Sequence, residues 1–321
     1  MASSVSALKE SRPVFARGSR EYTVREVIDA AHFRGEITPL WQEFLRRKEA
    51  AQRGEESDTE LDDSVVDEAA IAFRYQYDLI TAEETEAWLE ARGLTLADFS
   101  EYFARIEWGK IYAGRNETPA IPFEDAGEEQ RDLFVVDLIL SGELDRMAER
   151  LAWRVAASED ESLEDLEVAY RSQCEKRLTK EARERELGAV RLPLTRFGVE
   201  MIELESHDAA SEAFLCVRDD GMSMEEVARE GRYPFRRMEL VLENIPDEMQ
   251  QRFLSLTPGS LLEPTPRDDG FVLTRLLQKN EPKLDDAEVR ARVDQRILAR
   301  YFADLSSGKI QWRIPSSNGA E

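Results

Sequence analysis

The sequence predicts an α+β protein: a mainly helical N-terminal region, a small β/α domain and a closing C-terminal helix. Between residues 22 and 188 apolar side chains recur at helical spacing. After Pro193 the pattern changes, and residues 197–205 alternate polar with apolar side chains, which is typical of a half-buried strand. We therefore expect an N-terminal tail (1–21), a helical domain (22–188), a β/α domain (189–281) and a C-terminal helix and tail (282–321) that pack back on the helical domain.

The helical region begins with two short helices joined at a glycine. Residues 24–31 carry apolar side chains at i, i+3, i+4 and i+7, and Gly35 separates them from a second apolar set. Thr81 and Thr95 each stand three residues before an acid, the spacing of a helix capping box, so two further helices should start there. Longer helices are expected over residues 132–157 and 163–187.

The β/α domain should combine a few strands with short helices. The alternation over residues 197–205 and 270–277 predicts its first and its closing strand. The remaining expected elements, in chain order, are helical residues from 210 to 228, a strand at 237–242, a helix at 247–256, the C-terminal helix at 285–305 and an edge strand at 309–314.

The charge balance excludes several classes of partner. Lys and Arg total 43 against 67 for Asp and Glu, a net charge of −24. Such a chain repels phosphate groups, so we predict no nucleic-acid partner. An anionic lipid surface is disfavoured for the same reason, and the chain has no apolar run of about 18 residues, so no membrane partner is predicted. Residues 1–23 show no secretory signal, which favours the cytoplasm, and the two cysteines should be reduced.

Several segments of the C-terminal third are similar to parts of one known protein family. Ile245-Pro-Asp-Glu-Met249, the run 253–259 and the run 222–228 are similar to the parvulin-type prolyl isomerase domain, and residues 283–290 to the helix that follows it in SurA-type chaperones. Residues 70–106 resemble the helical chaperone segment of that family. The resemblance implies a helical client-binding region joined to an isomerase-like module, and it extends to cytoplasmic parvulin-related proteins of peptide maturation.

The resemblance also implies a pocket for the proline ring. Ile245, Met249 and Leu254 fall at the apolar positions of the family, and Met238 is a looser candidate. Each of these residues, taken singly, is also what a core position would contain. As a group, the predicted substrate-binding residues are Met238, Ile245, Met249, Leu254 and Val272.

The catalytic part of the family pattern is missing. Parvulins place two histidines on neighbouring strands, but here Val272 occupies one of those places and residues 200–202 the other. The only histidines of the chain, His32 and His207, lie far apart in the sequence. Catalytic residues, a metal site and a cofactor are therefore not predicted, and no nucleotide or serine-hydrolase motif is present.

Three functions follow as hypotheses. The leading one is a peptide-binding folding or maturation factor with a degenerate, inactive module, whose partners are unfolded or precursor peptides, with basic or proline-containing ones favoured. The second is an active prolyl isomerase with a non-histidine site. The third is a structural docking protein. The aromatic residues of the helical region should lie mostly in the core, with an open groove as the alternative.

Overall fold

The chain folds into two compact units. The computed structural model describes residues 9–57, 60–113, 121–160, 162–267 and 270–314. Unit 1 comprises residues 1–173 and 301–321, and unit 2 comprises residues 174–300. Helices predominate and two small antiparallel sheets accompany them, which confirms the predicted α+β class. None of the described helices is both long and apolar enough to cross a lipid bilayer.

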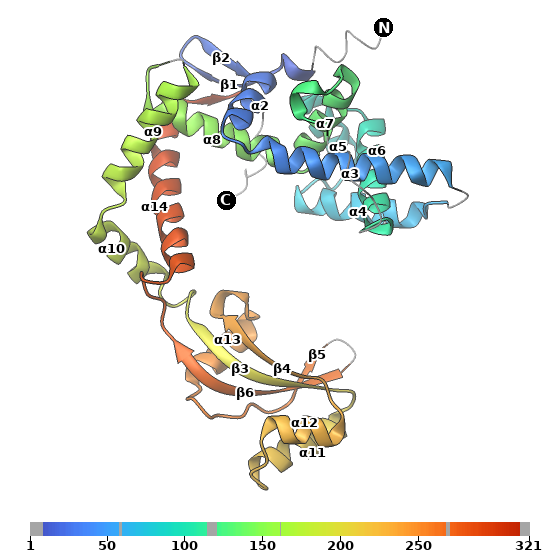
Figure 1. Cartoon of the computed structure of the whole chain (residues 1–321), viewed down its shortest axis with the longest axis vertical. Helices are drawn as coiled ribbons and strands as arrows, with labels where there is room; N and C mark the ends of the chain where they lie inside the picture. Colours follow the sequence, from blue (N-terminus) through green and yellow to red (C-terminus); the bar gives the residue numbers. More distant parts are fainter. Residues whose placement is uncertain (1–8, 58–59, 114–120, 161, 268–269, 315–321) are drawn as a thin grey trace. The chain divides into compact units, whose positions relative to one another are not determined.

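Unit 1 is mainly helical (Figure 1). The side chains of Thr81 and Thr95 accept the backbone N–H groups of Glu84 and Asp98, as the capping boxes in the sequence predict. The helices that lie wholly within the unit are α2 (Val24–Phe33), α3 (Ile37–Glu56), α4 (Asp63–Gln76), α5 (Ala82–Arg92), α6 (Leu96–Ile111), α7 (Glu128–Leu140) and α8 (Glu143–Ala157), with a 3-10 turn, η1 (Phe123–Asp125).

Aromatic side chains fill the centre of unit 1. The rings of Trp41, Phe44 and Phe134 are buried, with centroids 5.1 to 5.4 Å apart. A second group gathers around Phe73, whose ring contacts those of Tyr77, Trp88, Phe99 and Phe103. Most of the aromatic residues therefore stabilise the core, because pairs in such geometry add to the free energy of burial.

Two stretches that the apolar spacing predicts as single helices are each divided. Gly142, with a φ of 74°, separates α7 from α8, and Thr179 caps a separate helix α10 (Lys180–Val190) after α9 (Leu163–Arg177). In both cases the turn residue interrupts the backbone hydrogen bonds although the apolar pattern runs through it.

The first described strand lies in the segment that the sequence assigns to an N-terminal tail. Strands β1 (Pro13–Arg17) and β2 (Arg20–Thr23) form a hairpin, and β1 also pairs with β7 (Gln311–Trp312), so the sheet order is β2-β1-β7. Phe15 is fully buried and pairs with Trp312. This small sheet joins the two ends of the chain within unit 1.

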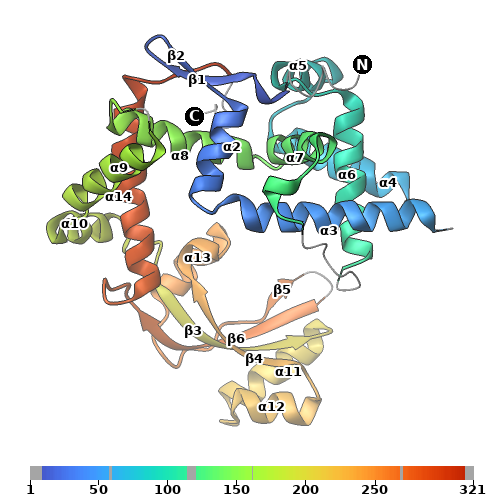
Figure 2. The same cartoon turned by 45° about the horizontal axis from the view of Figure 1, so that its top comes forward.

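Unit 2 is built on a four-stranded antiparallel sheet with the order β4-β3-β6-β5. Helices α11 (His207–Arg218) and α12 (Met224–Gly231) cover one face of the sheet, and α13 (Asp247–Ser255) lies against the other (Figures 1 and 2). The strands are β3 (Arg196–Leu204), β4 (Phe235–Val241), β5 (Thr265–Arg267) and β6 (Gly270–Asn280).

The C-terminal helix α14 (Ala287–Ser307) contributes residues to both units. Within unit 2, the buried carboxylate of Glu186 in α10 accepts hydrogen bonds from Arg296 and Arg300 of α14. Within unit 1, the buried ring of Phe302 stacks on those of Trp153 and Tyr170. The domain boundaries expected at residues 189 and 282 both lie inside unit 2.

Candidate functional site

The register of the unit 2 sheet decides which side chains share a face. Val199 of β3 pairs with Met238 of β4 and with Leu276 of β6, and directly paired residues project from the same face. Val199 and Leu276 belong to a buried cluster that includes residues of α13, so we call this the α13 face. Ile202 and Leu273 project from the opposite side and pack with α11 and α12, so we call that the α11/α12 face.

All five predicted binding residues lie on or beside the α13 face. Ile245 is buried in the cluster of that face, and Val272 is buried in β6 on the same side of the sheet as Leu276. Met249 and Leu254 are half-buried on α13 and pack against the same cluster. Met238, on the edge strand β4, is 45% exposed. The structure therefore brings Ile245, Met249 and Leu254 into one cluster, whereas Met238 and Val272 share only the sheet face with them.

A further methionine on this face was missed in the prediction. Met201 of β3 is half-buried, pairs with Thr274 and packs against the α13 cluster. The signal was present, because Phe197, Val199 and Met201 alternate along one strand face. Met201, Met238 and Met249 thus place three thioether side chains from three elements on the α13 face.

Several polar side chains of the α13 face have partners, among them Lys279, whose Nζ donates to the carbonyl of Leu254 over 2.9 Å. Arg236, which pairs with Met201, forms an ion pair of 3.4 Å with Glu203 on the neighbouring strand. The hydroxyl of Thr265 donates to the carbonyl of Val272 over 3.4 Å. Such a surface can hold an apolar side chain against the sheet, with an ion pair at its edge, but its described residues present no imidazole that could transfer a proton.

Neither histidine of the chain lies on the α13 face. His32 belongs to α2 in unit 1, where its Nε2 lies 2.9 Å from Glu124. His207 begins α11, is 73% exposed at its side chain, and packs edge-on against Phe271 with 5.4 Å between ring centroids. Phe271 belongs to the α11/α12 side of the sheet. The α13 face is therefore without an imidazole.

The described residues offer no metal site, and the thiol of Cys216 is not activated. Over residues 9–314, apart from the gaps given above, no three His, Cys, Asp or Glu side chains come close enough to hold a metal ion. Cys216 is half-buried against the α11/α12 cluster. Burial raises the pKa of its thiol, and neighbouring acids raise that pKa further, so Cys216 is protonated and weakly nucleophilic at neutral pH.

Comparison with known proteins connects the chain to structures of foldases, although no protein-family profile and no curated protein matches it. The foldase PrsA of Streptococcus pneumoniae is 12% identical, with a TM-score of 0.31 over 96% of this chain and 97% of that one. PrsA of Bacillus subtilis is 13% identical, with a TM-score of 0.26 over 97% and 94%. A structure described with the SurA-like chaperones PEB4 and Cj1289 of Campylobacter jejuni is 11% identical, with a TM-score of 0.20 over 94% and 98%. At such values the likeness says nothing about what this chain binds.

Proposed function

We propose that this chain binds segments of unfolded or precursor polypeptides, and that the α13 face of unit 2 is one of its binding surfaces. The supporting observation is the group of partly exposed methionines, Met201, Met238 and Met249, on a sheet face that one short helix covers. Methionine has a flexible, polarisable side chain, and surfaces rich in it accept apolar side chains of different shapes. An Xaa-Pro segment would place its ring against these thioethers.

We further propose that the α13 face binds peptides without catalysing their isomerisation, because of the side chains that it presents. Rotation about an Xaa-Pro bond must overcome a barrier of about 20 kcal/mol. Lowering this barrier requires groups that stabilise the twisted imide more than the planar one. The α13 face offers thioethers and aliphatic groups, and its Glu203–Arg236 ion pair is already formed. These groups favour holding a peptide over accelerating its isomerisation.

The charge of the chain favours clients of opposite charge. A net charge of −24 attracts basic segments and repels acidic ones over a Debye length of about 8 Å at physiological salt. We also propose a cytoplasmic location, for which the two cysteines without a disulfide are suited. Recovery of the native protein in the cytoplasmic fraction is the expected result, and recovery from an extracytoplasmic fraction would contradict this part.

The proposal is tested by two assays on the same peptides. A panel of Xaa-Pro tetrapeptides and one unfolded basic protein are assayed for binding by fluorescence anisotropy and for cis/trans exchange, with an established prolyl isomerase as the positive control. We expect binding with exchange at the uncatalysed rate. Turnover that Met249→Ala abolishes would instead make the α13 face an active site. If none of the peptides and unfolded proteins binds, the hypothesis of a structural docking protein would be favoured.

A further inference from the structure

The edge strand β4 of unit 2 is open along one side. In the sheet order β4-β3-β6-β5 it has a neighbour, β3, on one side only, and within the described residues no other strand pairs with it. Its central residues, 236–239, are all exposed, although they project alternately from the two faces of the sheet. An open edge of this kind presents a row of backbone N–H and C=O groups that can pair with another extended chain.

Two hydrogen bonds at the ends of β4 decide which of its backbone groups point outward. The amide of Glu203 donates to the carbonyl of Pro234, and the amide of Leu242 donates to that of Thr195. Inward and outward groups alternate along an antiparallel pair, and the register from 235 to 241 is unbroken, so the even-numbered residues bond to β3. The residues whose backbone groups point outward are Phe235, Arg237, Glu239 and Val241.

The charged side chains of β4 have partners within the sheet. Each forms an ion pair with a residue of β3, at 3.4 Å or less between the charged atoms. The pairs are Arg236–Glu203, Arg237–Glu200 and Glu239–Arg196. Because these charges are balanced across β3 and β4, a ligand at this edge is recognised through its backbone and not through a charged side chain.

The same alternation decides which face the side chains of an added strand would meet. Met238 pairs with Val199, so the even-numbered residues of β4 project from the α13 face. In an antiparallel added strand, the residues opposite them would also project over the α13 face and would direct their N–H groups away from β4. Proline has no N–H group, so it fits at these positions without the loss of a hydrogen bond.

We infer that β4 binds an extended polypeptide segment as an added antiparallel strand, with a proline of the segment over the α13 face opposite Met238. The inference rests on the proposed function and assigns the way in which the peptide is held. Only an extended backbone repeats N–H and C=O groups at the spacing of a strand edge. In a parallel strand, the residues over the α13 face would direct their N–H groups to β4, so a proline there would lose a hydrogen bond.

The charge of the chain favours a segment of another polypeptide over a second copy of the chain at this edge. Two copies each carry a net charge of −24 and repel one another, whereas a basic segment is attracted. The segment that fits best is therefore extended and basic, with apolar residues or proline at every second position.

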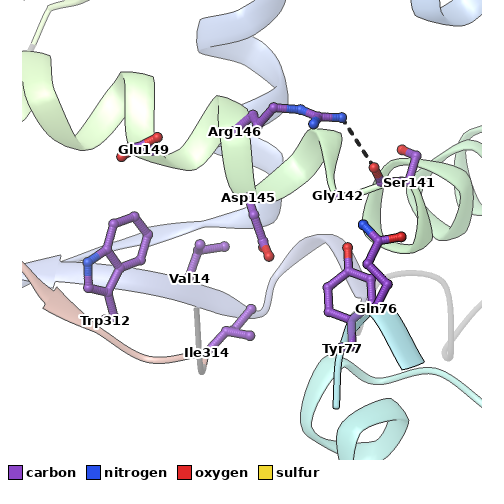
Figure 3. A pocket seen from close by; sticks show the side chains of 10 residues that line it. All are labelled: Val14, Gln76, Tyr77, Ser141, Gly142, Asp145, Arg146, Glu149, Trp312 and Ile314. Carbon is purple, nitrogen blue, oxygen red and sulfur yellow. Dashed lines mark hydrogen bonds between the residues drawn. The ribbon is translucent and has the colours of Figure 1, made fainter. Parts of the chain in front are cut away.

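Unit 1 contains a pocket with a volume of about 480 Å³ where β1, β7, the end of α4 and the start of α8 meet (Figure 3). Two of its charged side chains are engaged within the unit. Asp145 interacts electrostatically with the buried guanidinium of Arg92, and Arg146 donates to the carbonyl of Ser141 over 3.2 Å, the bond drawn in Figure 3. Because these groups have partners within unit 1, the pocket offers a peptide less than the open edge of β4 does.

The test uses the full chain and a seven-residue peptide with acetylated and amidated ends, Lys-Leu-Thr-Pro-Thr-Leu-Lys. Its leucines and its proline would lie over the α13 face, and its threonines would donate N–H groups to β4. Calorimetry measures the binding of this parent peptide and of four versions, each N-methylated at one threonine or one leucine. We expect N-methylation of either threonine to weaken binding at least about tenfold, and that of either leucine less than about threefold.

The outcomes distinguish this mode of binding from the proposed function. An equal loss for threonines and leucines, or a larger loss for leucines, would overturn antiparallel strand addition while peptide binding itself remained. Failure of a monomeric chain to bind the parent peptide would contradict both. Failure of the peptide to bind a chain that sediments as a dimer would assign the edge to a second copy and overturn the inference.

A proline variant of β4 tests the same contact from the side of the protein. Glu239→Pro removes an outward N–H group but no hydrogen bond to β3, and Glu239→Ala removes the same carboxylate while it keeps the N–H group. We expect Glu239→Pro to bind the parent peptide at least about tenfold more weakly than Glu239→Ala, and equal affinities would overturn the inference.

Hydrogen exchange of the unmodified chain gives the answer even if Glu239→Pro unfolds. Bound peptide should slow the exchange of the outward amides of Phe235 and Arg237 more than that of Arg236 and Met238, which already bond to β3. Equal slowing of all four amides, or of none, would contradict strand addition at β4.

Discussion

The two faces of the unit 2 sheet differ in how completely helices cover them. The α11/α12 face lies under two helices, and its central residues Ile202 and Leu273 have no exposed surface. The α13 face lies under one helix of nine residues. Its central residues Val199 and Leu276 also have no exposed surface, but Met201 and Met249 are only half-buried. One set of alternating strands thus supplies a closed face that stabilises the unit and a second face that is partly open at its methionines, where we propose that a peptide binds. Exposure of the second face costs hydrophobic free energy that a bound peptide would recover.

The largest expected effect is on stability and separates the two faces directly. Leu273→Ala removes a fully buried side chain from the α11/α12 face and should lower the free energy of unfolding of unit 2 by about 2 to 5 kcal/mol. Met249→Ala removes a half-buried side chain from the α13 face and should cost less than about 2 kcal/mol.

The measurement must report on unit 2 itself. All five tryptophans belong to unit 1, so their fluorescence follows that unit. Hydrogen exchange of the slowest amides in β3 and β6 gives the free energy of opening of unit 2. Equal losses in Leu273→Ala and Met249→Ala would show that the two faces are covered equally well.

The next effect concerns binding. Met238→Glu places a negative charge on the exposed edge of the α13 face and should weaken an Xaa-Pro peptide at least about tenfold, with little loss of stability because the side chain is 45% exposed. Leu215→Glu is the matched control, since Leu215 of α11 is 46% exposed and lies in a helix that covers the other face. If both variants bind as the wild type does, the α13 face is not the peptide site.

A smaller effect is expected from the charged contact within the closed face. Glu200 is buried and accepts a hydrogen bond of 2.9 Å from Nε of Arg237. Glu200→Gln weakens this charge-assisted bond and should cost about 1 kcal/mol, because Arg237 is largely exposed and water can replace the lost partner. Peptide affinity should be unchanged in Glu200→Gln, and a large fall in affinity would mean that the two faces are coupled.

The smallest expected effect is on binding when Cys216 is alkylated. The thiolate is the reactive form, and burial followed by nearby acids raises the pKa of Cys216, so alkylation in a Cys174→Ser background should be slow at pH 7 and accelerate above the usual thiol value of about 8.5. Cys216 packs on the α11/α12 side, so the alkylated protein should bind peptides normally. Fast alkylation at neutral pH would contradict the raised pKa of Cys216. Protection of Cys216 by bound peptide would contradict its location away from the peptide site.

What could be predicted from the sequence was mostly local. The caps at Thr81 and Thr95 depend on residues three apart, and the strands β3 and β6 are long enough for their alternation to be visible. Strand β5 has three residues, one of them Pro266, and is too short to show a period. The pairing of Phe15 with Trp312 joins the two ends of the chain, and no local pattern encodes such a contact.

Only part of the candidate site was proposed from the sequence. Ile245, Met249 and Leu254 were predicted because they fall at the apolar positions of the parvulin-type family that the segment resembles, and Met238 was a looser candidate. Met201 was considered as the position of a missing histidine and was not counted as part of an apolar surface, although alternation from Phe197 places it there. Glu203 and Arg236 escaped prediction because their ion pair depends on the register between two strands.

The most direct test of the central claim is photo-crosslinking of an Xaa-Pro peptide that carries a diazirine beside its proline, with the attached residues identified by mass spectrometry. The proposal predicts crosslinks to Met201, Met238 and Met249, and their loss when unlabelled peptide is added in excess. Crosslinks confined to residues of α11 and α12, such as Leu215, would place the peptide on the closed face and contradict the account.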